Sequence, residues 1–563
     1  MLPEADVGLS MIAVSPETSG DGPQIDSCIP YRPARVTTCE TCVLWWDFKS
    51  KESHEEASCV QSAINSVRDC LPLSVVDGQG FRDMMALAAP SYTVPTRPTV
   101  RARVEKRYAD ERSNIISRLE KATSVSLTTD TWTSNSTESF ITVTAHYLDA
   151  EWILHSDVLM TRAMPERHTA ENIASRLLEC VREFGLTGKV ECCVHDNARN
   201  IQKAGTLCPD WGDHSCFAHT LQLCIKPVLE LPSVSKVLSK CRKLVGHFKH
   251  STTVTAELHR RQERMRKEGE KQPTLALIQD VPTRWNSTQL MCSRLDKLRR
   301  VVTDIMLDDD VTKEADCDLL LRDGEWGIVA DISTVLGPFT HVTTFMSKDK
   351  DVSIGEMFPI VYSLVGKVLQ PCNNETALVA SMKTTLRDEM TERFQPGRDE
   401  TVESLPMLAS LLDSRYKKLS FLPRQLRRRT HTMLEGRLDD VPFKVSSRDD
   451  GDCATPAKRP RLEFMVTAPE SSVEDDLQLY LAGKMDDATP ALEWWRRNEN
   501  RFPKVAQVAR SVLAVPATSV PSERVFSSAG LVLNKLRNRL NSDIVGAILF
   551  LNKNMRSVKC DTE

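Results

Sequence analysis

The chain is 563 residues long, more than one hydrophobic core normally fills, so two to four domains are expected. Its composition, 41% hydrophobic and 27% charged residues, is that of a folded globular protein and excludes a globally disordered chain. Apolar runs stay well short of the about 20 residues that cross a bilayer, and the first residues lack a signal-peptide pattern, so we expect an intracellular protein. The net charge of -4 excludes a general attraction to nucleic acid, so DNA binding requires local basic patches.

Cysteines are frequent but show no disulfide pattern. There are 17, an odd number, and several fall inside apolar periodic segments, such as Cys180, Cys192 and Cys193. We interpret them as buried reduced thiols.

The first part of the chain predicts a tail and then a helix. Residues 1–65 are rich in Pro, Ser, Gly and Asp without a persistent period, which favours a tail. Over residues 101–121 apolar side chains recur at near-helical spacing in a charged background, which predicts an amphipathic helix. Residues 66–122 are therefore expected to form a helical N-terminal region.

An α/β pattern follows. Residues 125–128, 140–147 and 152–160 are rich in β-branched and aromatic side chains and predict three strands. Residues 171–184 carry one apolar helical stripe that ends at a glycine, and residues 189–194 predict a buried strand. The resulting order is typical of a mixed α/β sheet.

The second half of the chain is helical. From about residue 232 to residue 439 the pattern predicts an all-α block of long amphipathic segments. Residues 440–475 are poor in apolar side chains and predict a flexible linker. Helical, apolar sequence then resumes.

Two aspartates lie at predicted strand ends. Asp130 stands at the end of the first predicted strand, and Asp196 comes just past the fourth. Neighbouring strands of one sheet end at the same edge, so the two carboxylates can face each other, where a divalent cation is the natural partner. Asp at a strand end is also a common turn residue, so either one alone is weak support.

Five short motifs follow one another between residues 95 and 555. They are 128–134 (TTDTWTS), 195–200 (HDNARN), 216–223 (CFAHTLQL), 282–288 (PTRWNST) and 516–530 (PATSVPSERVFSSAG). Their order resembles hAT transposases and their domesticated relatives among the zinc-finger BED proteins.

That resemblance implies a fold and a reaction. The fold is an α/β ribonuclease-H-like core, interrupted by a large all-α insertion, with a helical C-terminal dimerisation region. Asp130, Asp196 and Glu523 stand at the family's catalytic Asp, Asp and Glu positions. Two Mg²⁺ ions, or Mn²⁺, would then support phosphoryl transfer on DNA.

The expected division of the chain combines the residue patterns with the resemblance. Its parts are a tail or degenerate zinc finger (1–65), a helical N-terminal region (66–122), the first part of the core (123–231), an all-α insertion (232–439), a linker (440–475) and the dimerisation region that completes the core (476–555).

The resemblance also implies DNA contacts. Arg284 and Trp285 match a position where the family has an aromatic residue that stacks on a flipped base; the alternative is a core tryptophan. Cys216 and His219 match the family's Cys-x-x-His pair, and two ligands are too few for a structural zinc site. We interpret His219 as a DNA or active-site contact and Cys216 as a packing residue.

A zinc finger and a nuclear import signal are further hypotheses. Cys39, Cys42, His54 and Cys59 have ligand types and spacings that a zinc site uses, but the aromatic lead-in of a BED finger is missing. A basic cluster, Lys458, Arg459 and Arg461, is typical of a nuclear import signal, although a solvated charge cluster is the alternative.

Basic patches also occur on predicted helices. Arg427, Arg428 and Arg429 form one, and Arg260 and Arg261 begin another that acidic neighbours dilute. Such patches suit phosphate contacts, and for the second patch a solvated face is an equal alternative.

Two apolar helix faces near the C-terminus favour pairing between protomers, as in the family's dimerisation region, although they can also close the chain's own core. They are Val505, Val508, Ala509, Val512 and Leu513, and Ile544, Val545, Ile548, Leu549 and Leu551.

Two functions remain open at this point. The complete acidic triad favours a nuclear, DNA-binding transposase that acts as a homodimer or higher homo-oligomer. The missing BED pattern favours a domesticated, catalytically inactive nuclear protein that binds DNA and regulates transcription.

Overall fold

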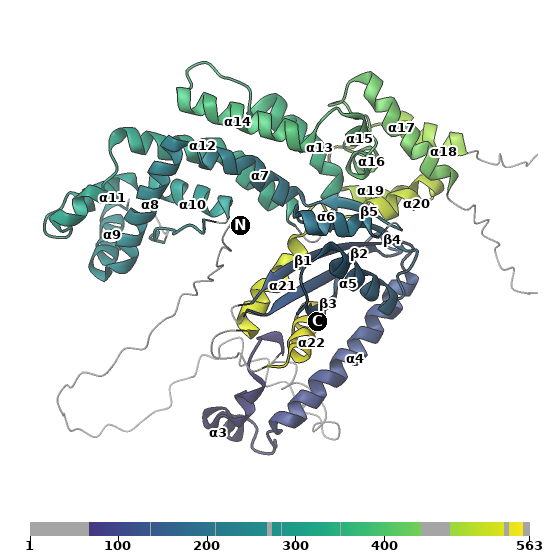
Figure 1. Cartoon of the computed structure of the whole chain (residues 1–563), viewed down its shortest axis with the longest axis horizontal. Helices are drawn as coiled ribbons and strands as arrows, with labels where there is room; N and C mark the ends of the chain where they lie inside the picture. Colours follow the sequence, from purple (N-terminus) through teal and green to yellow (C-terminus); the bar gives the residue numbers. More distant parts are fainter. Residues whose placement is uncertain are drawn as a thin grey trace, which may run out of the picture.

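The computed structural model describes most of the chain. The residues described are 67–134, 137–208, 210–266, 273–282, 284–348, 351–440, 473–533 and 540–555. They build two hydrophobic cores. We call the parts around them the sheet body, which holds the β-sheet, and the helical body (Figure 1).

The sheet body is built on five strands. They are β1 (Val125–Thr133), β2 (Ser139–Leu148), β3 (Leu154–Ala163), β4 (Val190–His195) and β5 (Gly212–Ser215). Their order is β3-β2-β1-β4-β5, with β2 antiparallel to β1 and β3, and β4 parallel to β1 and β5. The four predicted strands and the mixed sheet are confirmed.

The fifth strand was not predicted. Its residues, Gly-Asp-His-Ser, are neither β-branched nor aromatic and are half-buried or exposed. The strand forms because β4 offers a parallel partner, with Val194 opposite His214, and not because of its own residue preferences.

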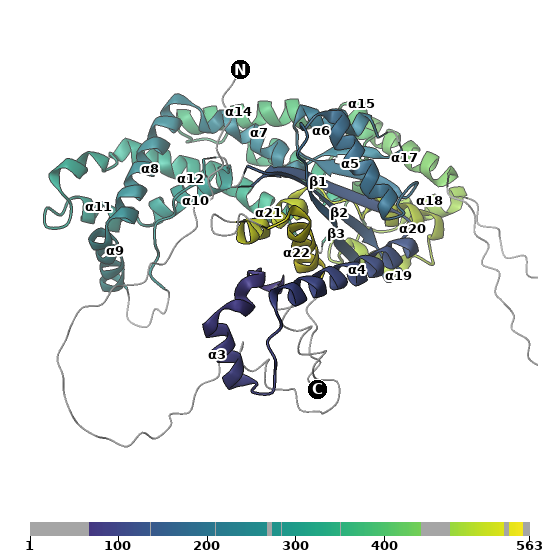
Figure 2. The same cartoon turned by 60° about the horizontal axis from the view of Figure 1, so that its bottom comes forward.

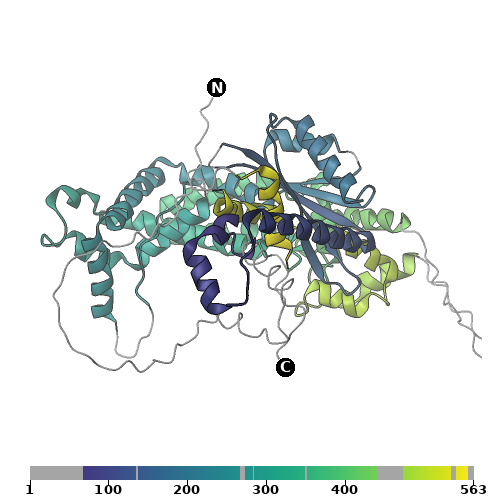
Figure 3. The same cartoon turned by 90° about the horizontal axis from the view of Figure 1, so that it is seen from below.

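The sheet body also contains helices, most of which cover the two faces of the sheet. They are α3 (Gln79–Ala88), α4 (Arg97–Lys121), α5 (Ala170–Glu183), α6 (Arg199–Thr206), α21 (Val520–Val532) and α22 (Ser542–Asn554), with a 3-10 turn η1 (Leu73–Asp77). Figure 2 shows α5 and α6 on one side of the sheet and α21 and α22 on the other. Seen from below, α4 runs along the sheet body beside α22, which also packs on β3 (Figure 3).

The predicted helices of this body are confirmed, and their ends have local causes. The Thr169 hydroxyl caps α5 by accepting a hydrogen bond from the amide of Asn172. Just beyond α5, Gly185 has a φ of 65°, a conformation that glycine adopts without strain.

The helical body contains the remaining helices of the described residues. They are α7 (Phe217–Leu229), α8 (Pro232–His250), α9 (Thr252–Met265), α10 (Trp285–Lys297), α11 (Arg299–Met306), η2 (Glu314–Leu319), α12 (Asp323–Met346), η3 (Ile354–Glu356), α13 (Met357–Ser363), η4 (Leu364–Val368), α14 (Ala377–Phe394), α15 (Asp399–Val402), α16 (Leu405–Leu412), α17 (Arg424–Asp439), α18 (Val473–Ala482), α19 (Ala491–Asn498) and α20 (Pro503–Val512). None of the described helices is long and apolar enough to cross a membrane.

The helical body starts and ends differently from the expected insertion. It already includes α7, whose Phe217 and Leu221 are fully buried in the helical core, so the packing begins before residue 232. It also takes in α18 to α20, so residues 476–555 divide between the two bodies.

The two apolar C-terminal faces are both covered within the chain. Val505 and Val512 lie in the helical core, and Val545 and Leu549 lie in the sheet core, all with 0% exposure. The expectation that these faces pair between protomers is therefore corrected: they close the chain's own cores.

Candidate active site

The two aspartates come together through the parallel pairing of β1 and β4. Thr128 on β1 stands opposite Val194 on β4. Asp130 and Asp196 each come two residues further along, on neighbouring strands. Asp196 directly follows β4 as expected, whereas Asp130 lies inside β1, which continues to Thr133, so its expected place at a strand end is corrected. The strand register thus brings together two residues that are far apart in the sequence.

Asp130 occupies the most enclosed position of the set. It is 7% exposed, and its Oδ1 accepts a hydrogen bond of 2.8 Å from the amide of Thr131. Burial, and then the negative charges of Glu523 and Asp196, raise the pKa of Asp130 to about 8. A group of carboxylates that repel one another in a desolvated place fits a divalent cation, whose charge removes the repulsion.

Glu523 reaches the same place from the other end of the chain. It lies in the first turn of α21, which packs against β1 and β2. The preceding Ser522 is fully buried, and its Oγ lies 2.8 Å from Oγ1 of Thr128 and 3.3 Å from Oγ1 of Thr144. These contacts hold the start of α21 on the sheet, and the first joins residues 394 positions apart.

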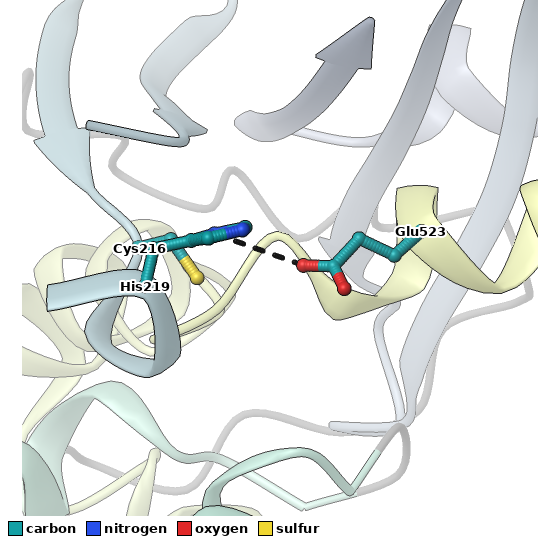
Figure 4. A group of neighbouring side chains, drawn as sticks. All are labelled: Cys216, His219 and Glu523. Carbon is teal, nitrogen blue, oxygen red and sulfur yellow. Dashed lines mark ion pairs between the residues drawn. The ribbon is translucent and has the colours of Figure 1, made fainter. Parts of the chain in front are cut away.

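Cys216 and His219 stand opposite Glu523 at the start of α7 (Figure 4). Nδ1 of His219 lies 3.7 Å from Oε1 of Glu523. One ligand atom from each of Cys216, His219 and Glu523 falls within 4.8 Å of the others. The expectation of His219 as an active-site contact fits this placement; a contact with DNA stays a prediction.

The surroundings of His219 favour its charged form. Burial lowers the pKa of an imidazole, but the nearby Cys216 sulfur and the carboxylates of Glu523 and Asp130 act in the opposite direction and raise the pKa of His219 to about 10. The imidazole is therefore a cation at neutral pH, next to two of the three acidic residues.

A backbone junction brings α7 and α21 together. The amide of Phe217 donates to the carbonyl of Ala517 (2.9 Å), and the amide of Ser519 donates to Sγ of Cys216 (3.3 Å). The amide of Cys216 itself donates to the carbonyl of His195 (2.7 Å). Cys216 thus links the end of β4 to the segment that leads into α21.

His195 braces the loop that carries Asp196. It is 1% exposed, its Nδ1 lies 2.6 Å from the backbone carbonyl of Asp196, and its Nε2 is hydrogen-bonded to Asp213. The roles of Ser522, Ser519 and Asp213 were not predicted, because they depend on partners distant in sequence. The one available signal was that Ser522 directly precedes Glu523 inside a motif.

The structure places Arg284 and Trp285 at the start of α10. Arg284 is exposed, whereas Trp285 is 5% exposed and packs in the helical core. This burial favours the alternative of a core tryptophan, and base stacking stays a prediction.

Several arginines of the basic patches form ion pairs or hydrogen bonds within the chain. Arg429 forms an ion pair with Asp399 (2.6 Å), and Arg427 donates to the carbonyl of Leu422 (2.8 Å). Arg260 and Arg261 are paired with Glu257, which supports the alternative of a solvated, internally paired face.

Two predicted sites fall outside the described residues. They are the zinc set, Cys39, Cys42, His54 and Cys59, and the import cluster, Lys458, Arg459 and Arg461.

Comparison with known proteins agrees with this layout. Three family models match the chain: the ZBED1 RNase-like domain over residues 128–210, the ZBED1 RNase-like helical domain over residues 214–335, and the hAT family C-terminal dimerisation region over residues 472–555. The chain belongs to the family of hAT transposases and zinc-finger BED proteins. In this hAT-family chain the first boundary, between residues 210 and 214, falls at β5, the last strand before α7.

Curated relatives support the same family. The chain is 25% identical over 542 residues to the human Zinc finger BED domain-containing protein 4, covering 90% of this chain and 44% of that protein. It is 23% identical over 518 residues to the Putative AC transposase of Zea mays, covering 85% and 62%. It is 22% identical over 549 residues to the Putative transcriptional regulator tpeD of Talaromyces stipitatus, covering 88% and 61%. The chain thus spans less than two thirds of each of these relatives.

Proposed function

We propose that this chain is a transposase-type protein that binds DNA and cleaves and joins its strands with divalent metal ions held by Asp130, Asp196 and Glu523. The observation that carries the proposal is that carboxylates from β1, the end of β4 and α21 act on one another: burial, and then the negative charges of Glu523 and Asp196, raise the pKa of Asp130 to about 8. The His219 imidazolium is one positive charge beside three carboxylates, so the site keeps an excess of negative charge that a divalent ion would remove.

The chemistry follows from charge. Mg²⁺ or Mn²⁺ ions, when bound, activate the attacking oxygen and stabilise the leaving oxygen of the phosphodiester. The carboxylates hold the ions, and burial of Asp130 excludes water from that side of the site. The His219 imidazolium supplies positive charge for a phosphate oxygen on the side facing Glu523.

DNA, a second copy of the chain and the nucleus complete the proposal. DNA binding is supported by the family, which includes proteins named as transposases and zinc-finger BED proteins. Homo-oligomerisation is supported by the match to a dimerisation region. Because the apolar C-terminal faces are closed internally, such a dimer would use other surfaces of this region. We expect the protein in the nucleus, where its substrate lies.

A strand-cleavage assay tests the catalytic proposal. The full chain is incubated with supercoiled plasmid and with branched duplexes in Mg²⁺ or Mn²⁺, beside Asp130→Asn, Asp196→Asn and Glu523→Gln. We expect the parent to nick DNA and each variant to lose at least about 100-fold in rate, since removing one transition-state contact already costs that much. Glu230→Gln, an exposed acid at the end of α7, is the matched control and retains activity.

Metal binding separates the alternatives. Mn²⁺ titration followed by electron paramagnetic resonance reports whether Asp196→Asn weakens binding. A parent that binds DNA and dimerises, but neither binds Mn²⁺ at these residues nor cleaves, is the domesticated regulatory protein instead. The fungal relative is named a putative transcriptional regulator, which supports this second function as the alternative to be tested.

A further inference from the structure

The ligand atoms opposite the aspartates form a set of their own. Cys216 is the N-cap residue of α7, His219 lies in the first turn of α7 and Glu523 lies on α21. One ligand atom from each falls within 4.8 Å of the others (Figure 4). Two helices distant in sequence therefore supply a sulfur, an imidazole nitrogen and a carboxylate oxygen. Mg²⁺ takes oxygen ligands, so a sulfur and a nitrogen in one set suit a different ion.

We propose that Cys216, His219 and Glu523 bind a borderline-soft divalent transition metal ion, Zn²⁺ in the first place, at a site separate from the magnesium positions on the aspartates. Cys, His and Glu are all zinc ligands, and the ion would displace the protons of the Cys216 thiol and the His219 imidazolium to solvent. Three protein ligands leave a fourth position for water or a phosphate oxygen. The inference concerns binding and stands on geometry; its consequence for activity rests on the proposed function.

The spacing requires little movement. Zn–S bonds of about 2.3 Å and Zn–N or Zn–O bonds of about 2.0–2.2 Å place tetrahedral ligand atoms roughly 3.3–3.8 Å apart. Nδ1 of His219 and Oε1 of Glu523 are already 3.7 Å apart. The remaining adjustment toward Cys216 is about 1 Å, within the reach of side-chain rotations of the glutamate and histidine.

Two further observations point to an ion. Nδ1 of His219 is buried and makes no hydrogen bond within the described part of the chain, although buried polar atoms are normally paired. Sγ of the fully buried Cys216 accepts the amide of Ser519 at 3.3 Å and lies at the N-cap of the 13-residue helix α7. Such donors around a sulfur are the outer contacts that metal-bound thiolates use.

Occupation of this set changes the neighbouring site. Glu523 would then bind the ion held by Cys216 and His219 rather than the ions beside Asp130 and Asp196. Zn²⁺ is therefore expected to inhibit Mg²⁺-dependent cleavage. The cleavage rate of each protein, parent or variant, is measured with and without Zn²⁺.

Cobalt titration tests the binding directly. The full chain carries Cys39→Ser and Cys42→Ser as a background, so that the N-terminal cysteine pair contributes no signal. We expect Co²⁺ to produce a thiolate-to-cobalt charge-transfer band that Zn²⁺ abolishes by displacement. Cys216→Ser should remove the band, whereas Cys224→Ala, a second fully buried thiol of α7, should leave it unchanged.

His219→Gln provides a second variant in case Cys216→Ser does not fold. It should keep a sulfur band and weaken Co²⁺ binding roughly 100-fold or more, because changes to outer contacts alone cost about 10–100-fold. A band that survives Cys216→Ser, an affinity unaffected by His219→Gln, or a parent without a band overturns the proposal. A parent with the band but without Mg²⁺-dependent cleavage retains this site and refutes the proposed function.

Discussion

The last five helices of the described residues divide between the two bodies, and the division explains where the site lies. Tyr480, Trp495 and Val512, on α18 to α20, are buried in the helical core, whereas Val525 and Leu549, on α21 and α22, are buried in the sheet core. The crossing between them, residues 513–519, contacts the start of α7. Glu523 comes four residues after that crossing. One matched family region thus serves two cores, and the candidate site lies at their junction.

The largest effects are expected from cavities in the two cores, which test whether the two bodies unfold separately. Leu549→Ala on α22 and Leu412→Ala on α16 each remove a fully buried side chain, and each should lower the free energy of unfolding by about 2–5 kcal/mol. Hydrogen exchange should rise in β3 and α4 for Leu549→Ala and in the helical body for Leu412→Ala. Equal increases in both bodies for either variant would show that the molecule opens as one unit.

The pH dependence of magnesium binding tests the electrostatics at the junction. The pKa of Asp130 is about 8, above its ordinary value of 3.8, so the metal-free folded protein keeps a proton that the unfolded chain releases. Its stability should therefore fall as the pH rises from about 4 to about 8. Mg²⁺ displaces this proton, so its affinity should weaken by up to about tenfold per pH unit below 8, about 1.4 kcal/mol each.

Thermal unfolding with and without Mg²⁺ at pH 6 and pH 8.5 measures this dependence. The stabilisation by Mg²⁺ should be larger at pH 8.5. Asp130→Asn, which has no proton to release, is the control and should give little stabilisation at either pH. Equal stabilisation of the parent at both values would contradict the raised pKa.

Ser522→Ala separates positioning from stability. It removes the contacts with Thr128 and Thr144, at a cost of about 1 kcal/mol in the free energy of unfolding. Strand cleavage should fall by roughly 10- to 100-fold, because a shift of about 1 Å in Glu523 affects the reaction more than the fold. Ser527→Ala, an exposed serine on the same helix, should change neither quantity. If the variant loses no more cleavage than its smaller folded fraction explains, Ser522 does not position Glu523.

The smallest effect is expected at the contact between the β2–β3 turn and α20. The Arg510 guanidinium lies 4.2 Å from the ring centre of Trp152, and both side chains donate to Glu499 at 2.7 Å. Arg510→Lys should lower the free energy of unfolding by about 1 kcal/mol, measured in urea, because lysine lacks the planar fork. Arg496→Lys, exposed on α19, is the control. If the two variants have the same free energy of unfolding, this contact does not join the two bodies.

Much of the sheet body is visible in the sequence because its signals are local. β-branched and aromatic runs mark β1 to β3, and an apolar stripe that ends at a glycine marks α5. β5 lacks such signals, since pairing with β4 creates it. The extent of the helical body was also hidden, because helical periodicity shows which face is apolar but not which core covers it.

By itself, the sequence determined four of the five strands and the order of the motifs, since these depend on residue type and short-range spacing. The three acidic residues were singled out by the resemblance that these motifs carry. The tertiary structure decided the rest. It placed Trp285 in a core, turned the C-terminal apolar faces inward and brought Cys216 and His219 to Glu523. The physical reason is that these outcomes depend on contacts between residues hundreds of positions apart, such as Thr128 with Ser522, which leave no periodic trace along the chain.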